Sequence, residues 1–154
     1  MANQVEQCLT EDLFLLLQQA RYATIATVDY ENNIPNVNAI SWVFAPDVNV
    51  IRIAVHNRSR ILKNIKSNYG VVLTLIADGS TYSITGTAET IVERIDDVPL
   101  KLAMVEMNVT EVRDIMFYGG KLRYEPLYEN TYDIEAAAKL DRQVMNALKK
   151  PNQK

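Results

Sequence analysis

The residues best suited to chemistry lie in one basic block. Between Asp47 and Asp78 the sequence has no acidic residue, yet it has five basic ones: Arg52, Arg58, Arg60, Lys63 and Lys66. The centre of the block, HNRSRILKNIKSN, falls where a predicted strand ends and a predicted helix begins. A helix N-terminus offers unpaired backbone N–H groups and a partial positive charge, so a phosphate monoester is a candidate ligand for this block. The alternative is a solvated amphipathic helix whose basic side chains bind nothing.

Two further side chains could take part. Arg52 lies inside the apolar segment VNVIRIAV, where a charged group needs either solvent or an anionic partner. His56 is the only histidine and immediately precedes the basic centre. A structural or phosphate-binding role for His56 is favoured over a role as proton donor, and no catalytic residue is predicted.

Other kinds of site are excluded by what the sequence lacks. One histidine and one cysteine, Cys8, cannot build a His-rich metal site, a zinc site of several thiolates or an internal disulfide. The sequence contains no Walker loop, no GxGxxG and no GxSxG motif. Asp96 and Asp97 form a carboxylate pair that is expected in a solvated turn.

Length, net charge and hydropathy limit the number of domains, the kinds of partner and the location of the protein. The 154 residues carry 16 Lys+Arg against 19 Asp+Glu, a net charge of −3, which argues against a nucleic-acid partner. No apolar run approaches the roughly 20 residues needed to cross a bilayer, and the first residues do not have the pattern of a signal peptide. We therefore expect a single domain spanning residues 1–154, without a membrane partner and located in the cytoplasm.

Hydrophobic periodicity and turn residues predict the secondary structure. Short connections between the first strands favour antiparallel neighbours, and Gly86 within a strand suggests a bulge, a barrel bend or a close backbone approach. The segment 71–77 is almost entirely apolar, which predicts burial on both faces. Strands are expected at 22–28, 35–44, 48–55, 71–77, 81–92 and 127–134, and helices at about 10–20, 56–68, 99–107, 110–118 and 135–149.

This order favours a mainly β protein with peripheral helices. Long strands joined by short turns predict a closed or partly closed antiparallel barrel, because a parallel sheet would need a helix after nearly every strand. The barrel core is expected at about 22–134, flanked by the first and last helices.

The segment 23–91 resembles the pyridoxamine-phosphate-oxidase-like family, whose fold is the FMN-binding split barrel. The resemblance rests on ATIATVD followed by a turn and Pro35, and on the segment Ser59-Arg60-Ile61. It continues with Asn68 nine residues after the serine, the strand VVLTLIA and the strand segment ITGTAE. Many members have lysine where this sequence has Ile61, and Arg60 or Lys63 is expected to supply that charge.

The resemblance implies an antiparallel split barrel, an FMN cofactor and a homodimer with the flavin at the subunit interface. The isoalloxazine ring would lie against the second and third strands, mostly on backbone groups, and the phosphate would lie after the third strand. The implied ring residues are Asn38, Ala39, Ile40, Ser41, Ala54 and Val55, the implied phosphate residues are His56, Asn57, Ser59 and Arg60, and Arg52 and Lys63 complete the candidate cofactor-binding set. The C-terminal substrate motifs of true pyridoxamine phosphate oxidases are absent, so that reaction is not predicted.

Three functions are compared. The first is an FMN-dependent oxidoreductase or electron-transfer protein that acts on a small-molecule donor or acceptor. The second is a non-enzymatic module that holds a flavin or another anionic metabolite, as a store or sensor. The third, a barrel that binds single-stranded nucleic acid, is disfavoured because Tyr69 is the only aromatic residue in the basic block.

Overall fold

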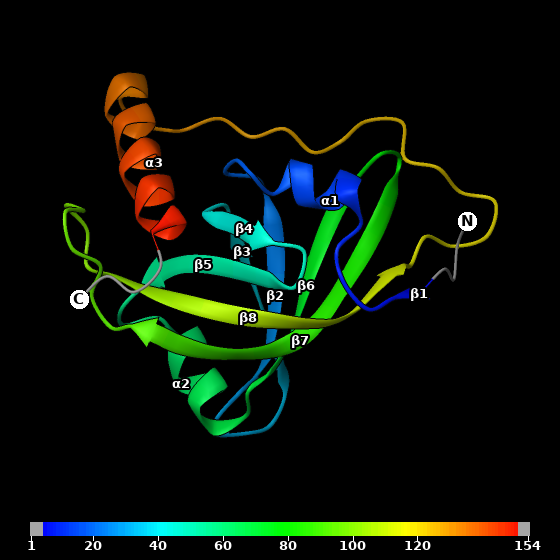
Figure 1. Ribbon diagram of the computed structural model, residues 1–154, viewed down its shortest axis with the longest axis horizontal. Helices are drawn as coiled ribbons and strands as arrows, with labels where there is room; N and C mark the ends of the chain where they lie inside the picture. Colours follow the sequence, from blue (N-terminus) through cyan, green and yellow to red (C-terminus); the bar gives the residue numbers. More distant parts are fainter. Residues whose placement is uncertain (1–4, 151–154) are drawn as a thin grey trace.

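A mostly antiparallel sheet with three helices around it forms the structure, a computed structural model that describes residues 5–150 (Figure 1). The expected mainly β class is confirmed. The strands are β1 (Val5–Glu6), β2 (Ala23–Val28), β3 (Pro35–Ile40), β4 (Val43–Asp47), β5 (Val50–His56), β6 (Gly70–Ala77), β7 (Ser80–Val92) and β8 (Leu102–Asp114), and the helices are α1 (Glu11–Leu16), α2 (Arg60–Ser67) and α3 (Ile134–Lys149).

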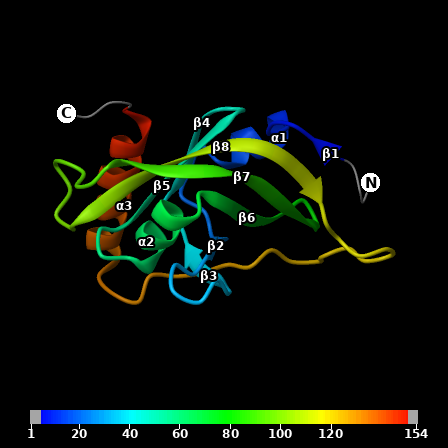
Figure 2. The same cartoon turned by 90° about the horizontal axis from the view of Figure 1, so that it is seen from below.

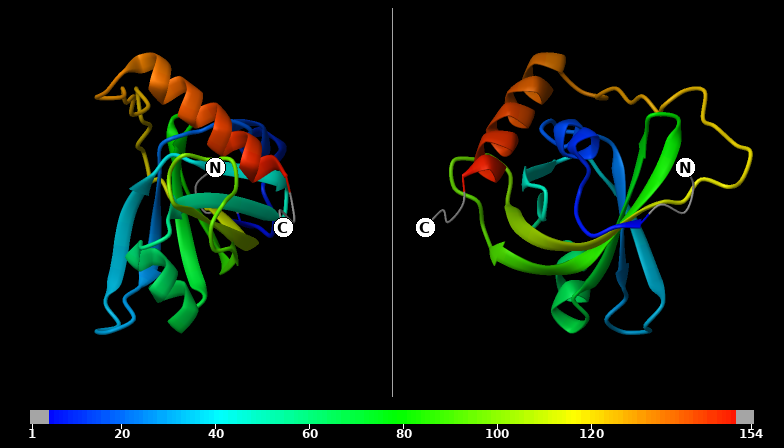
Figure 3. Two further views of the ribbon diagram at one scale, coloured as in Figure 1. Left: turned by 90° about the vertical axis from the view of Figure 1, so that its left-hand side faces the viewer. Right: turned by 45° about the vertical axis from the view of Figure 1, so that its right-hand side comes forward.

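The sheet is an open barrel. Its order is β3-β2-β6-β7-β8-β5-β4, with β1 added beside β8, and every pairing is antiparallel. The two end strands, β3 and β4, are consecutive in the chain but do not pair with each other. The split-barrel prediction is therefore confirmed (Figure 3).

The single strand expected at 35–44 is in fact two strands. The chain bends at Ser41 and Trp42, where the Val43 N–H donates to the Ser41 carbonyl over 3.1 Å. After the bend, β4 pairs with β5, and the Ala54 N–H donates to the Trp42 carbonyl. Because of the bend, one continuous segment forms both end strands of the sheet, β3 and β4.

The helices begin at side-chain caps. Thr10 accepts from the Leu13 N–H, Ser59 from the Ile61 N–H, and Asp133 from the N–H groups of Glu135 and Ala136. The expected helices at 56–68 and 135–149 are confirmed, with α2 beginning a few residues later than expected. Helix α1 ends at Leu16, which makes it shorter than the expected segment 10–20.

The two helices expected at 99–107 and 110–118 are wrong. Strand β8 occupies this region and pairs with β7 on one side and β5 on the other. Residues of β8 face two hydrophobic clusters, Val105 and Met107 in one and Leu102 and Met104 in the other. Because both faces are covered, apolar residues occur in succession and the alternation that identifies a strand is missing.

Residues 115–133 contain no strand, so the strand expected at 127–134 is also wrong. This segment crosses from the end of β8 to α3, and its first part is attached to the β6–β7 turn (Figure 3). The Leu122 N–H donates to the Gly79 carbonyl over 2.7 Å, and Glu125 forms an ion pair with Arg21.

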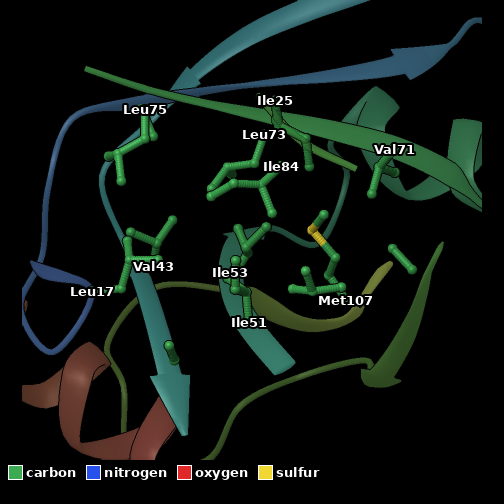
Figure 4. Packing of buried hydrophobic residues seen from close by; sticks show 14 of the residues in the cluster. Leu17, Ile25, Val43, Ile51, Ile53, Val71, Leu73, Leu75, Ile84 and Met107 are labelled. Carbon is green, nitrogen blue, oxygen red and sulfur yellow. The ribbon is translucent and has the colours of Figure 1, made fainter. Parts of the chain in front are cut away.

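Two hydrophobic cores support the sheet. The larger fills the barrel, where Ile25, Leu73, Ile84 and Met107 meet with other residues (Figure 4). The smaller lies between α3 and the sheet and includes Phe44, Ala54 and Met104. The expected burial of 71–77 on both faces is wrong, because buried residues of β6 alternate with half-buried ones.

Gly86 confirms the expected bulge and close approach. The register between β7 and β8 shifts at Thr85 and Gly86. A Cβ atom at Gly86 would lie 2.1 Å from the carbonyl oxygen of Asn108, so no other residue fits there without moving the backbone.

Candidate functional site

Helix α2 follows β5 in the chain and lies beside the β2–β3 hairpin (Figure 2). One buried side chain of α2 fixes it there. The fully buried Asn64 donates to the Thr27 hydroxyl and accepts from the Tyr30 N–H, each over 2.9 Å. The start of α2, with the Ser59 cap, is therefore held in a fixed position between these two elements.

Arg60 is paired with carboxylates of its own chain. Its Nε donates to Asp29 Oδ2 and its Nη2 to Glu31 Oε1, both over 2.6 Å, and its Cζ lies 5.0 Å from the centre of the Tyr30 ring. The hydrogen bond from Arg60 is the main reason why the pKa of Asp29 is lowered from 3.8 to about 2, and the bond to Asp29 raises the pKa of Arg60. The positive charge of Arg60, which was expected to hold a phosphate, is thus already balanced by two carboxylates of the same chain.

Asp29 and Glu31 are the residues that sequence reasoning missed. Asp29 is buried, and its Oδ1 accepts from the N–H groups of Glu31 and Asn32. This geometry is an Asx-type turn, which the segment DYENN already indicates. The pairing with Arg60 spans 31 residues, so only the fold could reveal it.

Arg52 also has an internal partner. Its Nε donates to Glu106 Oε2 and its Nη1 to the Leu148 carbonyl, both over 3.1 Å. The Arg52 side chain is buried where the end of α3 meets β5 and β8. It lies away from the start of α2, and Glu106 supplies the anionic partner that its position in the strand required.

The remaining phosphate candidates are consecutive at the junction of β5 and α2. The His56 Nδ1 accepts from the Arg58 N–H over 3.1 Å, so a neutral His56 ring carries its hydrogen on Nε2. Asn57 donates its N–H to the Lys101 carbonyl, and Ser59 donates its N–H to the His56 carbonyl. Arg58 is exposed and forms no ion pair within residues 5–150, which leaves its guanidinium available.

The residues predicted to contact the flavin ring lie along the free edge of β3, at the bend that follows it, and near the end of β5. Asn38 and Ala39 are exposed, and Ile40 and Ser41 are half-buried. Strand β3 pairs with β2 alone among the described strands. Ala54 and Val55 are buried, so only their backbone groups could face a ligand. The two sets are linked through the Ser41–Trp42 bend, because Trp42 accepts from the Ala54 N–H.

A cleft of about 1090 Å³ opens on another side of α2, between this helix and the β7–β8 pair. Asn57 and Lys63 are the only predicted cofactor residues that line it. Lys63 also holds its Nζ 5.7 Å from the centre of the Tyr30 ring, so it lies between the cleft and the Arg60 ion pairs.

Clusters of metal-ligating side chains and long apolar helices were both sought in the described part of the chain. No group of three His, Cys, Asp or Glu side chains in residues 5–150 could hold a metal ion. None of the helices there is long and apolar enough to span a membrane.

Comparison with known families decides the assignment of the chain. A family model described as pyridoxamine 5'-phosphate oxidase matches residues 9–115. The chain belongs to this family. The resemblance inferred from the sequence is therefore confirmed, and the matched region extends beyond segment 23–91 at both ends. A comparison with curated proteins finds no match.

Solved structures share the fold. A Lactobacillus delbrueckii protein assigned as a pyridoxamine 5'-phosphate oxidase is 21% identical, with a TM-score of 0.59 over 73% of this chain and 98% of its own. HupZ from Group A Streptococcus is 16% identical, with a TM-score of 0.58 over 75% and 99% of the two chains. An F420 reductase is 23% identical, with a TM-score of 0.53 over 64% and 93%.

Proposed function

We propose that the chain binds FMN, with the phosphate at the β5–α2 junction and the ring along the free edge of β3 and the end of β5. The observation that carries the proposal is the capped start of α2, where Arg58 is unpaired beside Ser59 in a member of this family. A helix N-terminus combined with an arginine is a general arrangement for a phosphate monoester. We further propose that the protein is a homodimer whose second copy covers the flavin.

The residues at the junction fit a phosphate, with less charge than the family pattern provides. Ile61, at the position of the family lysine, is buried in the barrel core and offers no donor. Arg60 is shared by Asp29 and Glu31. Arg58 and the Asn57 amide remain as side-chain donors, and Lys63 lies one turn further along α2.

FMN would supply the redox chemistry, and the chain would bind and orient it. The exposed His56 could donate from Nε2 to an anionic oxygen, because its Nδ1 is occupied by the Arg58 N–H. The ring would lie beside the end of β5 at Ala54 and Val55, whose side chains point into the two cores and offer no polar group.

The test compares FMN with riboflavin, which lacks the phosphate. The sole tryptophan, Trp42, lies beside the proposed ring surface and reports binding through quenching of its fluorescence. We expect FMN to bind more tightly than riboflavin, and Arg58→Ala to weaken FMN roughly tenfold while leaving riboflavin unchanged. Arg142→Ala, on exposed α3 surface, is the control. Failure to take up FMN, or equal affinity for both flavins, would refute the proposal.

A second candidate function is a non-enzymatic flavin-binding module. It is favoured by the pairing of Arg60 and by the lack of an acid–base pair at the junction among residues 56–60. Reduction of the bound flavin by NADH or NADPH would identify an oxidoreductase, whereas an unchanged visible spectrum would identify a passive holder. F420 is titrated beside FMN because one structural neighbour is an F420 reductase.

A further inference from the structure

The cleft between α2 and the β7–β8 pair is a second place where a small molecule could bind. Its volume of about 1090 Å³ reaches the upper end of the roughly 300–1,000 Å³ usual for ligand pockets. Leu62 and Ile65 of α2 and Ala88 and Ala103 of the sheet give the cleft an apolar surface. Ala88 and Ala103 are small and buried, and Leu62 is half-buried.

The cations of the cleft have no carboxylate partners. Lys66 of α2 and Arg94, just after β7, are exposed, and neither forms an ion pair within residues 5–150. Glu89 and Glu93 also line the cleft, and they lie on the β7 side. The α2 side is therefore purely basic. An anionic group would be attracted to the α2 side and to Arg94 and repelled by Glu89 and Glu93, which would orient the ligand.

We propose that this cleft binds an anionic small molecule with an apolar body, of the kind represented by an aromatic carboxylate. The carboxylate lies against Lys66 and Arg94, and the apolar body contacts Leu62 and the exposed Tyr69 ring, which line the same cleft. Burial of the apolar body against these two side chains supplies most of the affinity, and the cations supply the preference for charge.

Asn57 and Lys63 lie at the border between this cleft and the proposed flavin site, but the cations proposed to hold each ligand differ. Along an α-helix each residue advances by about 100°, which places Lys66 about 120° around α2 from Arg60. Arg60 faces Asp29 and the β2–β3 hairpin, whereas Lys66 lines the cleft. Occupation of the cleft does not require FMN.

The test uses 2-naphthoate as the anionic probe and 2-naphthamide as its neutral match. Each is titrated into the full-length ¹⁵N-labelled protein, as purified and again after saturation with FMN, and amide chemical shifts are followed. We expect naphthoate to shift the amides of Ala88, Ala103 and Lys66, in the presence or absence of FMN. Naphthamide should bind at least roughly threefold more weakly than naphthoate, because it makes no ion pair.

The double variant Lys66→Ala/Arg94→Ala should reduce naphthoate affinity roughly fivefold while leaving naphthamide affinity unchanged. Lys139→Ala, an exposed lysine of α3, is the matched control and should bind like the wild type. Shifts confined to residues outside the cleft, equal affinity for the two probes, or displacement of naphthoate by FMN would each overturn the proposal. Loss of FMN binding with retention of naphthoate would refute only the proposed flavin site.

Discussion

The two sides of α2 carry similar cations in opposite electrostatic settings. On the hairpin side, Arg60 is held by Asp29 and Glu31 and rests on the Tyr30 ring. On the cleft side, Lys66 faces an open volume and has no ion pair in the described residues. A single short helix thus presents one cation as part of the fold and another as a potential binding group.

The difference shows that a basic run in a sequence does not by itself locate an anion site. The decisive residues, Asp29 and Glu31, belong to a hairpin far from the run in sequence. Cations that already have partners stabilise structure, whereas those without partners remain available for a ligand. Three substitutions test the packing, the anchoring and the ion pair on which this difference depends.

The largest effect is expected from Gly86→Ala, in the strand β7 that supplies one wall of the cleft. The new Cβ atom would lie 2.1 Å from the Asn108 carbonyl oxygen and 3.0 Å from Met107 Cε. Backbone atoms cannot move aside cheaply, so we expect a loss of about 3 kcal/mol or more in the free energy of unfolding, measured by urea denaturation. Gly70→Ala is the control, because its Cβ would meet only the Asn68 side chain at 3.3 Å. Equal stability of the two variants would contradict the close packing of β7 on β8.

On the hairpin side, Asn64→Leu should have the next largest effect. The substitution keeps the side-chain size but leaves the buried Thr27 hydroxyl and the Tyr30 N–H without their partner. We expect a loss of roughly 2–3 kcal/mol in the free energy of unfolding. Asn146→Leu, an exposed position on α3, should change stability by roughly 0.5 kcal/mol or less. A loss of roughly 2–3 kcal/mol in the control as well as in Asn64→Leu would show that Asn64 does not fix α2.

The smallest effect is expected from Asp29→Asn, and it depends on pH. The pKa of Asp29 is lowered from 3.8 to about 2, so its charged form stabilises the fold above pH 3.8, and this contribution is lost as the pH falls through about 2. The variant should be less stable than the wild type at neutral pH, and the difference should shrink between pH 4 and pH 2.

Urea denaturation over a series of pH values measures this difference. Asp96→Asn, an exposed aspartate without an ion pair in residues 5–150, controls for the loss of one carboxylate. The Asp29→Asn variant should also bind FMN more tightly, because Arg60 is then released from one partner. A stability difference that does not vary with pH would refute the ion pair, and weaker FMN binding would show that Asp29 positions Arg60 for the phosphate.

The sequence predicted those elements whose local signals agree with their packing. Strands β2, β5, β6 and β7 and helices α2 and α3 were expected near their observed positions, because turns and caps mark their ends. The split barrel and the family were also predicted. Strand β8 was not, because the segment KLAMVEM is rich in helix-forming residues and tertiary burial on both faces overrides that preference.

The candidate site was predicted in part, for a related reason. The capped junction at Ser59 and its neighbours followed from the order of strand and helix. The pairing of Arg60 with Asp29 and of Arg52 with Glu106 depends on contacts between residues distant in sequence. The unpaired state of Lys66 and the cleft beside it depend on the same long-range folding, so composition alone could not reveal them.

Strand β8 has a consequence for how the molecule comes apart. It is hydrogen-bonded to β1, β5 and β7, and it contributes side chains both to the barrel interior and to the layer beneath α3. Neither core can persist once β8 leaves, because each would lose a wall. We therefore expect α3 and the barrel to denature in one cooperative transition, so that calorimetric and spectroscopic melting curves coincide.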